Sequence, residues 1–254
     1  MNANTIQIFI MLLVFSSSCK PIKEVGSYKT DSAINHIGIS TAYKFPPLEI
    51  PKGMYLDSIA VYDSLSRAGY IAYYLQSKEI ENVGFNQVIL QEVKNQIIHE
   101  QQFVEPYEED LPDEIIYSYI LRPTEIYSNG QIISISNIID TYYKGGNHHN
   151  YTRHTFNYDL KKHKPIRFND VFRLQSKTDS AEFITFAEQF TLDGCTDWDL
   201  PYEYLDFSFA NSGIYINPNL SWACISTRSL LPYETKNKFI NKEWIKQNQL
   251  PTKK

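Results

Sequence analysis

The sequence has no excess of basic residues, and this absence limits the partners that the chain can have. Its 24 lysines and arginines are outnumbered by 29 aspartates and glutamates, which gives a formal net charge of −5 at pH 7. Nucleic-acid binding needs a basic face, so we expect no nucleic-acid partner. Glycine is also scarce, with 10 residues, whereas 19 tyrosines and 14 phenylalanines are present. Aromatic residues favour β-sheet, and a hydrophobic fraction of 43% is typical of a folded domain.

Motifs of known catalytic chemistry are missing as well. No G-x-S-x-G nucleophile elbow, H-E-x-x-H zinc motif or phosphate loop occurs in the chain. His148, His149 and His154 form the densest group of metal-binding side chains, but on an extended strand their imidazoles lie too far apart to share an ion. Only a Gly145-Gly146 turn that folds back on the strand could bring them together. We therefore expect no metal site, no cofactor and no enzymatic activity.

A hydrophobic run long enough to cross a membrane is absent, but a shorter run lies near the N-terminus. Residues 6–15 are apolar apart from Gln7. This is the length of a signal-peptide core and is well below the roughly 20 residues of a membrane span. Three serines then precede Cys19, an arrangement that resembles a lipobox. We predict a lipoprotein signal peptide over residues 1–18, a lipid anchor on Cys19, and export to a bacterial membrane, facing the periplasm or the cell surface.

The rest of the chain divides into a tether and one folded domain. Residues 19–50 are polar, contain prolines and lack a helical period, so they are typical of a linker. Within the domain, residues 51–254, apolar residues spaced by three and four over 84–102 predict an amphipathic helix. A second helix is predicted over 180–190, and a terminal helix and tail over 233–249. Strands are predicted at 70–81, 115–126, 133–143, 151–160, 204–209, 213–217 and 222–227.

Antiparallel hairpins interrupted by separate helices indicate an α+β domain. Asn129-Gly130 is a strong signal for one of these hairpin turns, because both residues accept a positive φ. We expect a largely antiparallel, twisted sheet packed with two or three helices. A small N-terminal part would extend to about residue 105, and a second part would begin at about residue 115.

Two features of the domain leave their interpretation open. Cys195 and Cys224 lie near predicted strand ends, so an exported domain could join them in a disulfide or keep two buried thiols. A proline-containing segment also gathers negative charge, which would attract a basic partner or simply favour solubility. The acidic residues of this predicted binding loop are Glu105, Glu108, Glu109, Asp110, Asp113 and Glu114.

The stretch from Tyr142 to Phe172 carries a resemblance to a known family. It contains the glycine turn Gly145-Gly146 followed by His148, then a strand that ends in Asp-Leu-Lys, then an Asp-Val-Phe turn. In this pattern the two glycines form a turn that His148 braces. The stretch resembles a family of extracytoplasmic bacterial domains of unknown function, which includes the lysozyme-binding sensor region of the anti-sigma factor RsiV and the domain beside the PdaC-type peptidoglycan deacetylase. The likeness covers roughly residues 70–239.

The resemblance implies a binding domain at the cell envelope. Its ligand would be a lysozyme-like protein or peptidoglycan, and the acidic segment fits a basic protein of the first kind. An enzyme or accessory domain that acts on cell-wall glycan is the alternative, and a purely structural envelope protein is a third. The family provides no ligand-binding residue that can be transferred to this chain.

Overall fold

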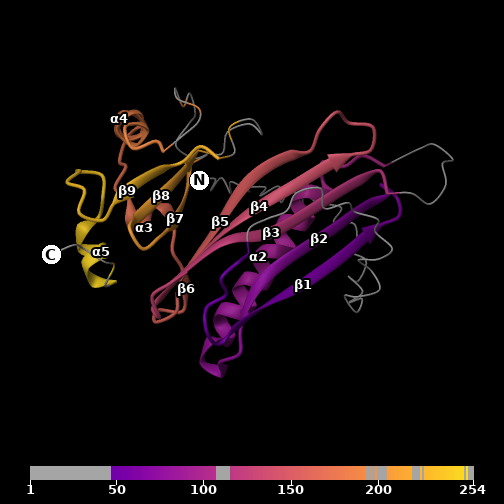
Figure 1. Ribbon diagram of the computed structural model, residues 1–254, viewed down its shortest axis with the longest axis horizontal. Helices are drawn as coiled ribbons and strands as arrows, with labels where there is room; N and C mark the ends of the chain where they lie inside the picture. The colour runs from indigo at the N-terminus through magenta and orange to yellow at the C-terminus, as the bar shows by residue number, and fades with distance from the viewer. Residues whose placement is uncertain are drawn as a thin grey trace, which may run out of the picture.

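Two β-sheets and a few helices make up the computed structural model, which confirms the α+β class (Figure 1). The structure describes residues 47–106, 115–192, 195, 198, 205–218, 224, 226–248 and 250. The large sheet has six strands in the order β1-β2-β3-β4-β5-β6, and the small sheet has three in the order β7-β8-β9. In the described part of the chain, no helix is both long enough and apolar enough to span a membrane.

The large sheet is mixed, with one parallel pair. Strands β2 and β3 run parallel, while the other neighbours pair antiparallel. Parallel neighbours need a long crossover, and a 3₁₀ turn (Ile80–Asn82) followed by helix α2 (Val83–Gln101) provides most of it. The strands are β1 (Met54–Asp63), β2 (Ala68–Ser77), β3 (Tyr117–Ser128), β4 (Ile132–Tyr143), β5 (Asn150–Asp159) and β6 (Lys164–Pro165).

Helix α2 forms where the apolar spacing predicts a helix, and it covers one face of the large sheet. Phe85, Ile89, Val93 and Ile97 recur every four residues, and all four are buried. Asn86 joins the helix to the end of β2, because its amide accepts from Ser77 N at 2.7 Å and donates to Ser77 O at 2.9 Å. Burial of this apolar stripe fixes the helix against the sheet.

Turn chemistry explains the connection between strands β3 and β4. Gly130 has a φ of +84°, and the Asn129 side-chain oxygen accepts from Ile132 N at 2.7 Å, so the β3–β4 hairpin forms at the predicted Asn-Gly pair.

Strand β1 was not expected from the sequence. It is an edge strand with exposed Tyr55, Leu56 and Tyr62, so it lacks the alternation of a half-buried strand.

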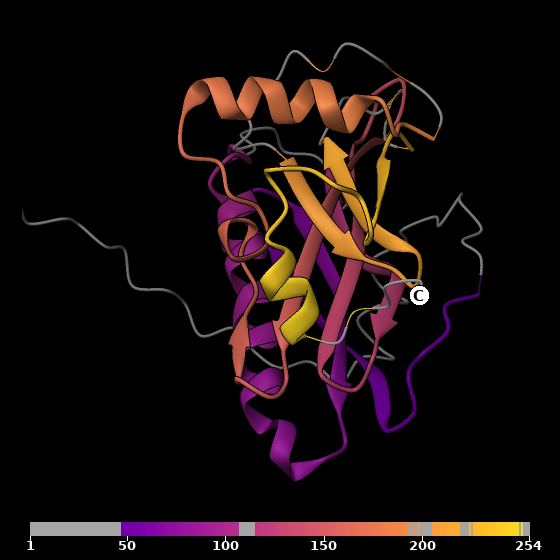
Figure 2. The ribbon, with the colours of Figure 1, turned by 90° about the vertical axis from the view of Figure 1, so that its left-hand side faces the viewer.

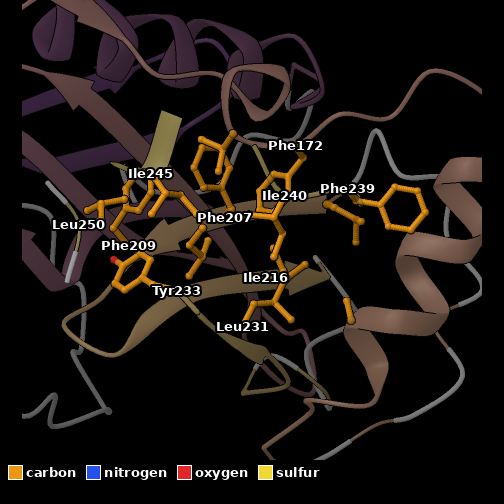
Figure 3. Packing of buried hydrophobic residues seen from close by; sticks show 14 of the residues in the cluster. Phe172, Phe207, Phe209, Ile216, Leu231, Tyr233, Phe239, Ile240, Ile245 and Leu250 are labelled. Carbon is orange, nitrogen blue, oxygen red and sulfur yellow. The ribbon is translucent and has the colours of Figure 1, made fainter. Parts of the chain in front are cut away.

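The small sheet and three short helices enclose a second core (Figure 2). The ring of Phe172 packs against those of Phe183 and Phe207, with centroid distances of 5.1 and 5.7 Å. Figure 3 shows neighbouring members of this cluster from β8, β9 and α5. Ser176 caps helix α4 by accepting from Asp179 N at 3.0 Å. The elements are α3 (Phe168–Val171), α4 (Lys177–Glu188), β7 (Leu205–Phe209), β8 (Gly213–Pro218), β9 (Ser229–Pro232) and α5 (Lys242–Gln247).

The end of the chain differs from the sequence prediction. The last strand is β9 at Ser229–Pro232, whereas the prediction placed it at 222–227; among the described residues of that range, Cys224 lies in a 3₁₀ turn and Ser226 in a turn. The aromatic and apolar residues of that range led to the error. Cys195 and Cys224 form a disulfide with their Cα atoms 5.8 Å apart. A disulfide fits an oxidising compartment outside the cytoplasm.

Candidate functional site

Strands β4 and β5 present different side chains on their two faces. Ile133 and Ile135 face α2 and belong to its hydrophobic cluster. Ser134, Ser136 and Asn157 lie on the opposite face and are buried too. Because successive side chains on a strand alternate between faces, one pair of strands builds an apolar interface on one side and a polar interface on the other.

Side-chain hydrogen bonds join this polar face to strand β7. The Ser134 hydroxyl donates to Asn157 Oδ1 at 2.5 Å and accepts from Phe209 N at 2.9 Å. The Asn157 amide donates to Phe207 O at 2.7 Å. These bonds satisfy buried polar groups, which would otherwise destabilise the fold. They fix the small sheet at one position on the large sheet.

Asp206 on β7 makes the next contacts along the same junction. Thr155 N donates to Asp206 Oδ2 at 2.6 Å, and the Thr155 hydroxyl also contacts this carboxylate. Desolvation between the sheets raises the pKa of Asp206, although the charge of His154 and the bonds from Thr155 act in the opposite direction. The junction therefore contains a carboxyl group in an environment that disfavours its charge.

A pocket of about 220 Å³ opens between the two sheets beside these bonds. Its floor comes from β3 and β4, and its roof from β7, β8 and the turn between them. Three serine hydroxyls, one amide, one carboxylate and two tyrosines give it both polar and aromatic walls. The lining residues are Glu125, Ile126, Tyr127, Ser134, Ser136, Ser208, Phe209, Ala210, Asn211 and Tyr215.

Two arginines contact the walls of this inter-sheet pocket. Arg228 donates from Nη1 to both carboxylate oxygens of Glu125, at 2.8 and 2.7 Å, and its guanidinium carbon lies 3.9 Å from the centre of the Tyr215 ring. Arg153 donates from Nη1 to the Ser136 hydroxyl at 2.8 Å. Burial and then the charge of Arg228 lower the pKa of Arg153. Each arginine therefore contacts a residue of the pocket wall, although neither arginine is among the described residues that line the pocket.

A contact between a histidine and a glutamate lies on the α2 side of β5. His154 Nε2 is 3.4 Å from Glu92 Oε1 on α2. Burial lowers the pKa of His154, but its contact with Glu92 and the charge of Asp206 outweigh this effect, so its pKa is raised. The same contact with His154 lowers the pKa of Glu92 against the opposing effect of burial. His154 therefore lies between two carboxyl groups, Glu92 and Asp206, whose charges raise its pKa.

The glycine turn lies at the far end of β4 and β5, away from the pocket. Gly145 has a φ of +85°, and Gly146 N donates to Tyr143 O at 2.8 Å. His148 Nδ1 is 3.2 Å from His149 O within this turn. His149 Nδ1 is 2.7 Å from Asp140 Oδ1, and its ring stacks on Tyr142. The described residues contain no group of three or more potential metal ligands.

Other predicted site residues lie mostly outside the part of the chain that the structure describes. This applies to the lipidation site Cys19 and to five of the six acids of the acidic segment, whereas Glu105 is described and exposed. The five acids are Glu108, Glu109, Asp110, Asp113 and Glu114. Glu105, the described residue of the acidic segment, is not among the described residues that line the inter-sheet pocket.

Sequence reasoning missed the pocket residues for a clear reason. Ser134 and Ser136 look like the solvent face of an alternating strand, and that is how the sequence pattern interprets them. Glu125 and Arg228 are 103 positions apart and have no local signal. The one available sequence signal of a buried polar face is the alternation of small polar residues with isoleucines along a long strand.

Comparisons with known proteins give similarity in structure only. The chain matches no known family profile, and no curated protein matches it. A DUF3298 family protein from Pseudomonas aeruginosa PAO1 matches 79% of this chain and 98% of its own length, at 13% identity and a TM-score of 0.46. A DUF3298 family member from Bacteroides fragilis NCTC 9343 matches 74% and 94%, at 13% identity and a TM-score of 0.41. Both matches are of structure at low sequence identity, and the description of neither protein names a ligand.

Proposed function

We propose that this chain is a non-catalytic binding domain of the bacterial cell envelope, anchored through Cys19, that holds a sugar of peptidoglycan in the inter-sheet pocket. The pocket is the observation that carries the proposal. It combines hydroxyl and amide groups with the ring of Tyr215. Binding sites for small ligands have this character, with apolar or aromatic walls and a few placed polar groups.

The size of the pocket favours a small group of a larger ligand. Small-molecule sites are roughly 300–1,000 Å³, and this pocket is about 220 Å³. A single sugar ring or its substituent therefore fits better than a glycan chain. The fixed hydrogen bonds of Ser134 and Asn157 hold the two walls at a constant separation, which reduces the entropy lost on binding.

The charges of the pocket support binding rather than glycan cleavage. Glycoside hydrolysis commonly uses two carboxyl groups on either side of the scissile bond. Among the described lining residues Glu125 is the single acid, and it is bonded to Arg228. A mechanism that needs a second carboxylate in this pocket has no such group among the described lining residues.

The proposal is tested by the binding of soluble peptidoglycan fragments to the full chain in detergent, measured by calorimetry. We expect saturable binding that Tyr215→Ala weakens, because the ring forms a wall of the pocket. Tyr62→Ala is the matched control, since Tyr62 lies exposed on the edge strand β1. Absence of binding, or equal affinity in the Tyr215 variant, would overturn the proposal.

A basic protein partner such as lysozyme is a second candidate. The concentration of acids between Glu105 and Glu114 and the net charge of −5 favour it. Such attraction weakens with salt, because mobile ions screen exposed charges. Retention of the full chain on immobilised lysozyme at low and moderate salt tests this candidate. Retention should fail after neutralisation of Glu108, Glu109 and Asp110, and absence of retention at both salt concentrations would exclude lysozyme.

A further inference from the structure

The two edges of the large sheet differ in what covers them. Beside β5, Ile166 N donates to Asn157 O at 2.8 Å and Thr155 N donates to Asp206 of the small sheet, so this edge has neighbours. At the opposite edge, β1 is the last strand over ten residues, and none of the other described strands pairs with its outer side (Figure 1). An uncovered edge strand offers unpaired backbone groups to another chain.

The alternation of the β1–β2 ladder shows which backbone groups face outward. Lys78 N donates to Gly53 O at 2.9 Å, and hydrogen-bonded pairs alternate along an antiparallel ladder. The odd-numbered residues of β1 therefore bond to β2. Ser58 N agrees with this assignment, because it donates to the side chain of the neighbouring Asp57 at 2.8 Å. The outward backbone groups belong to Leu56, Ser58, Ala60 and Tyr62.

Two apolar side chains are exposed along the same edge. Leu56 is 36% exposed and Tyr62 is 47% exposed. Both lie on the face away from α2, because the odd-numbered neighbours Ile59 and Val61 pack against the α2 cluster. Tyr62 pairs with Gly69 of β2, so its direct neighbour on that strand has no side chain to cover its ring. A strand added at this edge would cover both side chains.

We infer that β1 is a dimerisation edge, to which a second copy of this chain adds its own β1 in the antiparallel direction. The outward groups allow hydrogen-bonded pairs between even-numbered residues alone. In a register centred on Ile59, Leu56 lies opposite Tyr62 of the second copy, and Ser58 lies opposite Ala60. Two aliphatic–aromatic pairs related by a two-fold axis then form together, which is the self-complementarity that a two-fold interface needs.

The acids of β1 favour this register over its neighbours. It places Asp57 opposite Val61 of the second copy, and like charges directly opposite each other are avoided. A shift of two residues in one direction brings Asp57 opposite Asp63. A shift in the other direction pairs Leu56 with the small Ala60 and separates it from Tyr62. Pairing in the favoured register exchanges the bond between Ser58 N and Asp57 for one to a backbone oxygen of the second copy.

A cysteine at position 59 tests the register on the full chain in detergent under mild oxidation. Ile59 would meet its own counterpart in a non-hydrogen-bonded pair, with Cα atoms about 4.5 Å apart, so Ile59→Cys should form a disulfide-linked dimer on a non-reducing gel. Val61→Cys is the matched control, because Val61 lies on the same face and packs against the same cluster. Its two copies would be roughly 13 Å apart along the strands and should not cross-link. A cross-link at 61 instead of 59, or at neither position, would overturn the inference.

Hydrogen exchange on the unmodified chain avoids any loss of folding. The outward amides of Leu56, Ala60 and Tyr62 should gain protection as the protein concentration rises. The amides of Ile59 and Val61 bond to β2 and should be protected at every concentration. Protection of the outward amides that does not depend on concentration would mean that the same chain covers its own edge, and would overturn the inference. Absence of protection at all concentrations would overturn it too.

A charge on the edge should separate the two copies. Leu56→Lys replaces the aliphatic side of both cross-strand pairs and should weaken association about tenfold or more. Leu65→Lys is the matched control, since Leu65 is exposed in the turn after β1 and lies outside the paired residues. Sedimentation of both variants in detergent measures association. Equal association of the two variants would contradict pairing through β1, whatever the pocket binds.

Discussion

The two faces of strands β4 and β5 form interfaces of opposite character. Toward α2, Ile133 and Ile135 pack with Phe85 in a cluster built mainly of aliphatic and aromatic side chains. Toward the small sheet, Ser134 and Asn157 make directed hydrogen bonds and leave a pocket beside them. Apolar packing fills space and gives stability, whereas hydrogen bonds between rigid sheets fix a geometry and tolerate a gap. The polar interface is therefore the one suited to a ligand.

Removing a large side chain from the α2 interface should have the largest effect. Phe85 is fully buried and contacts the rings of Phe156 and Tyr158. Phe85→Ala should lower the free energy of unfolding by about 3–5 kcal/mol, because it removes apolar burial and leaves a cavity. Urea denaturation measures the loss. Sugar binding by the fraction that stays folded should not change, and a change would mean that the two interfaces are coupled.

Loss of the disulfide should destabilise the small sheet rather than the α2 interface. Cys195 and Cys224 close a loop with a sequence separation of 29. Replacing both by serine should cost roughly 2–4 kcal/mol, since the unfolded chain gains freedom. Hydrogen exchange compares the two regions: amides of β7–β9 should lose protection more than those of α2. Equal loss in both would show that the molecule unfolds as one unit.

A single hydroxyl of the junction should matter less than either of these. Ser134→Ala leaves Asn157 Oδ1 and Phe209 N without their partner. The expected cost is about 1–3 kcal/mol, the desolvation penalty of unsatisfied groups. Ser58→Ala on the edge strand is the matched control and should change stability by less than about 0.5 kcal/mol. Both values come from denaturant titration, and equal costs would show that the Ser134 bonds do not hold the junction.

The pH dependence of stability should show the smallest effect, and it compares individual ionisable groups. The pKa of His154 is raised in the folded state. Its contribution to the free energy of unfolding is therefore fully present below the unfolded pKa of about 6.5 and is lost as pH rises through the folded pKa. Glu92 has a lowered pKa, so its contribution is present above about 4.5 and is lost as pH falls through the folded value. Asp206, with a raised pKa, favours the folded state at low pH. His154→Gln should therefore flatten the dependence of stability on pH above pH 6.5, and an unchanged dependence would contradict a raised pKa of His154.

Much of the fold could be predicted from the sequence, because local patterns decided it. The spacing of Phe85, Ile89 and Val93 predicted α2, and Asn129-Gly130 predicted the β3–β4 hairpin. The parallel pairing of β2 with β3 could not be predicted this way, since it depends on where a crossover helix returns the chain. Edge strand β1 was missed because its exposure removes the alternating pattern.

The candidate site was beyond local patterns. Glu125 lies on β3, Tyr215 on β8 and Arg228 just before β9, and their contacts exist only after the small sheet packs on the large one. Sequence reasoning chose dense groups instead, such as the histidines near the glycine turn and the acidic segment. Those groups are conspicuous because they are close in sequence, whereas this pocket is assembled by hydrogen bonds between sheets.

Chemical-shift mapping tests the division between the two faces most directly. The amides of the full chain in detergent would be followed by NMR while a soluble peptidoglycan fragment is added. The account predicts shifts at Ser136, Ser208 and Tyr215, with Phe85 and the rest of the α2 interface unchanged. Saturable shifts confined to α2 or to the glycine turn, with none at the pocket, would contradict it.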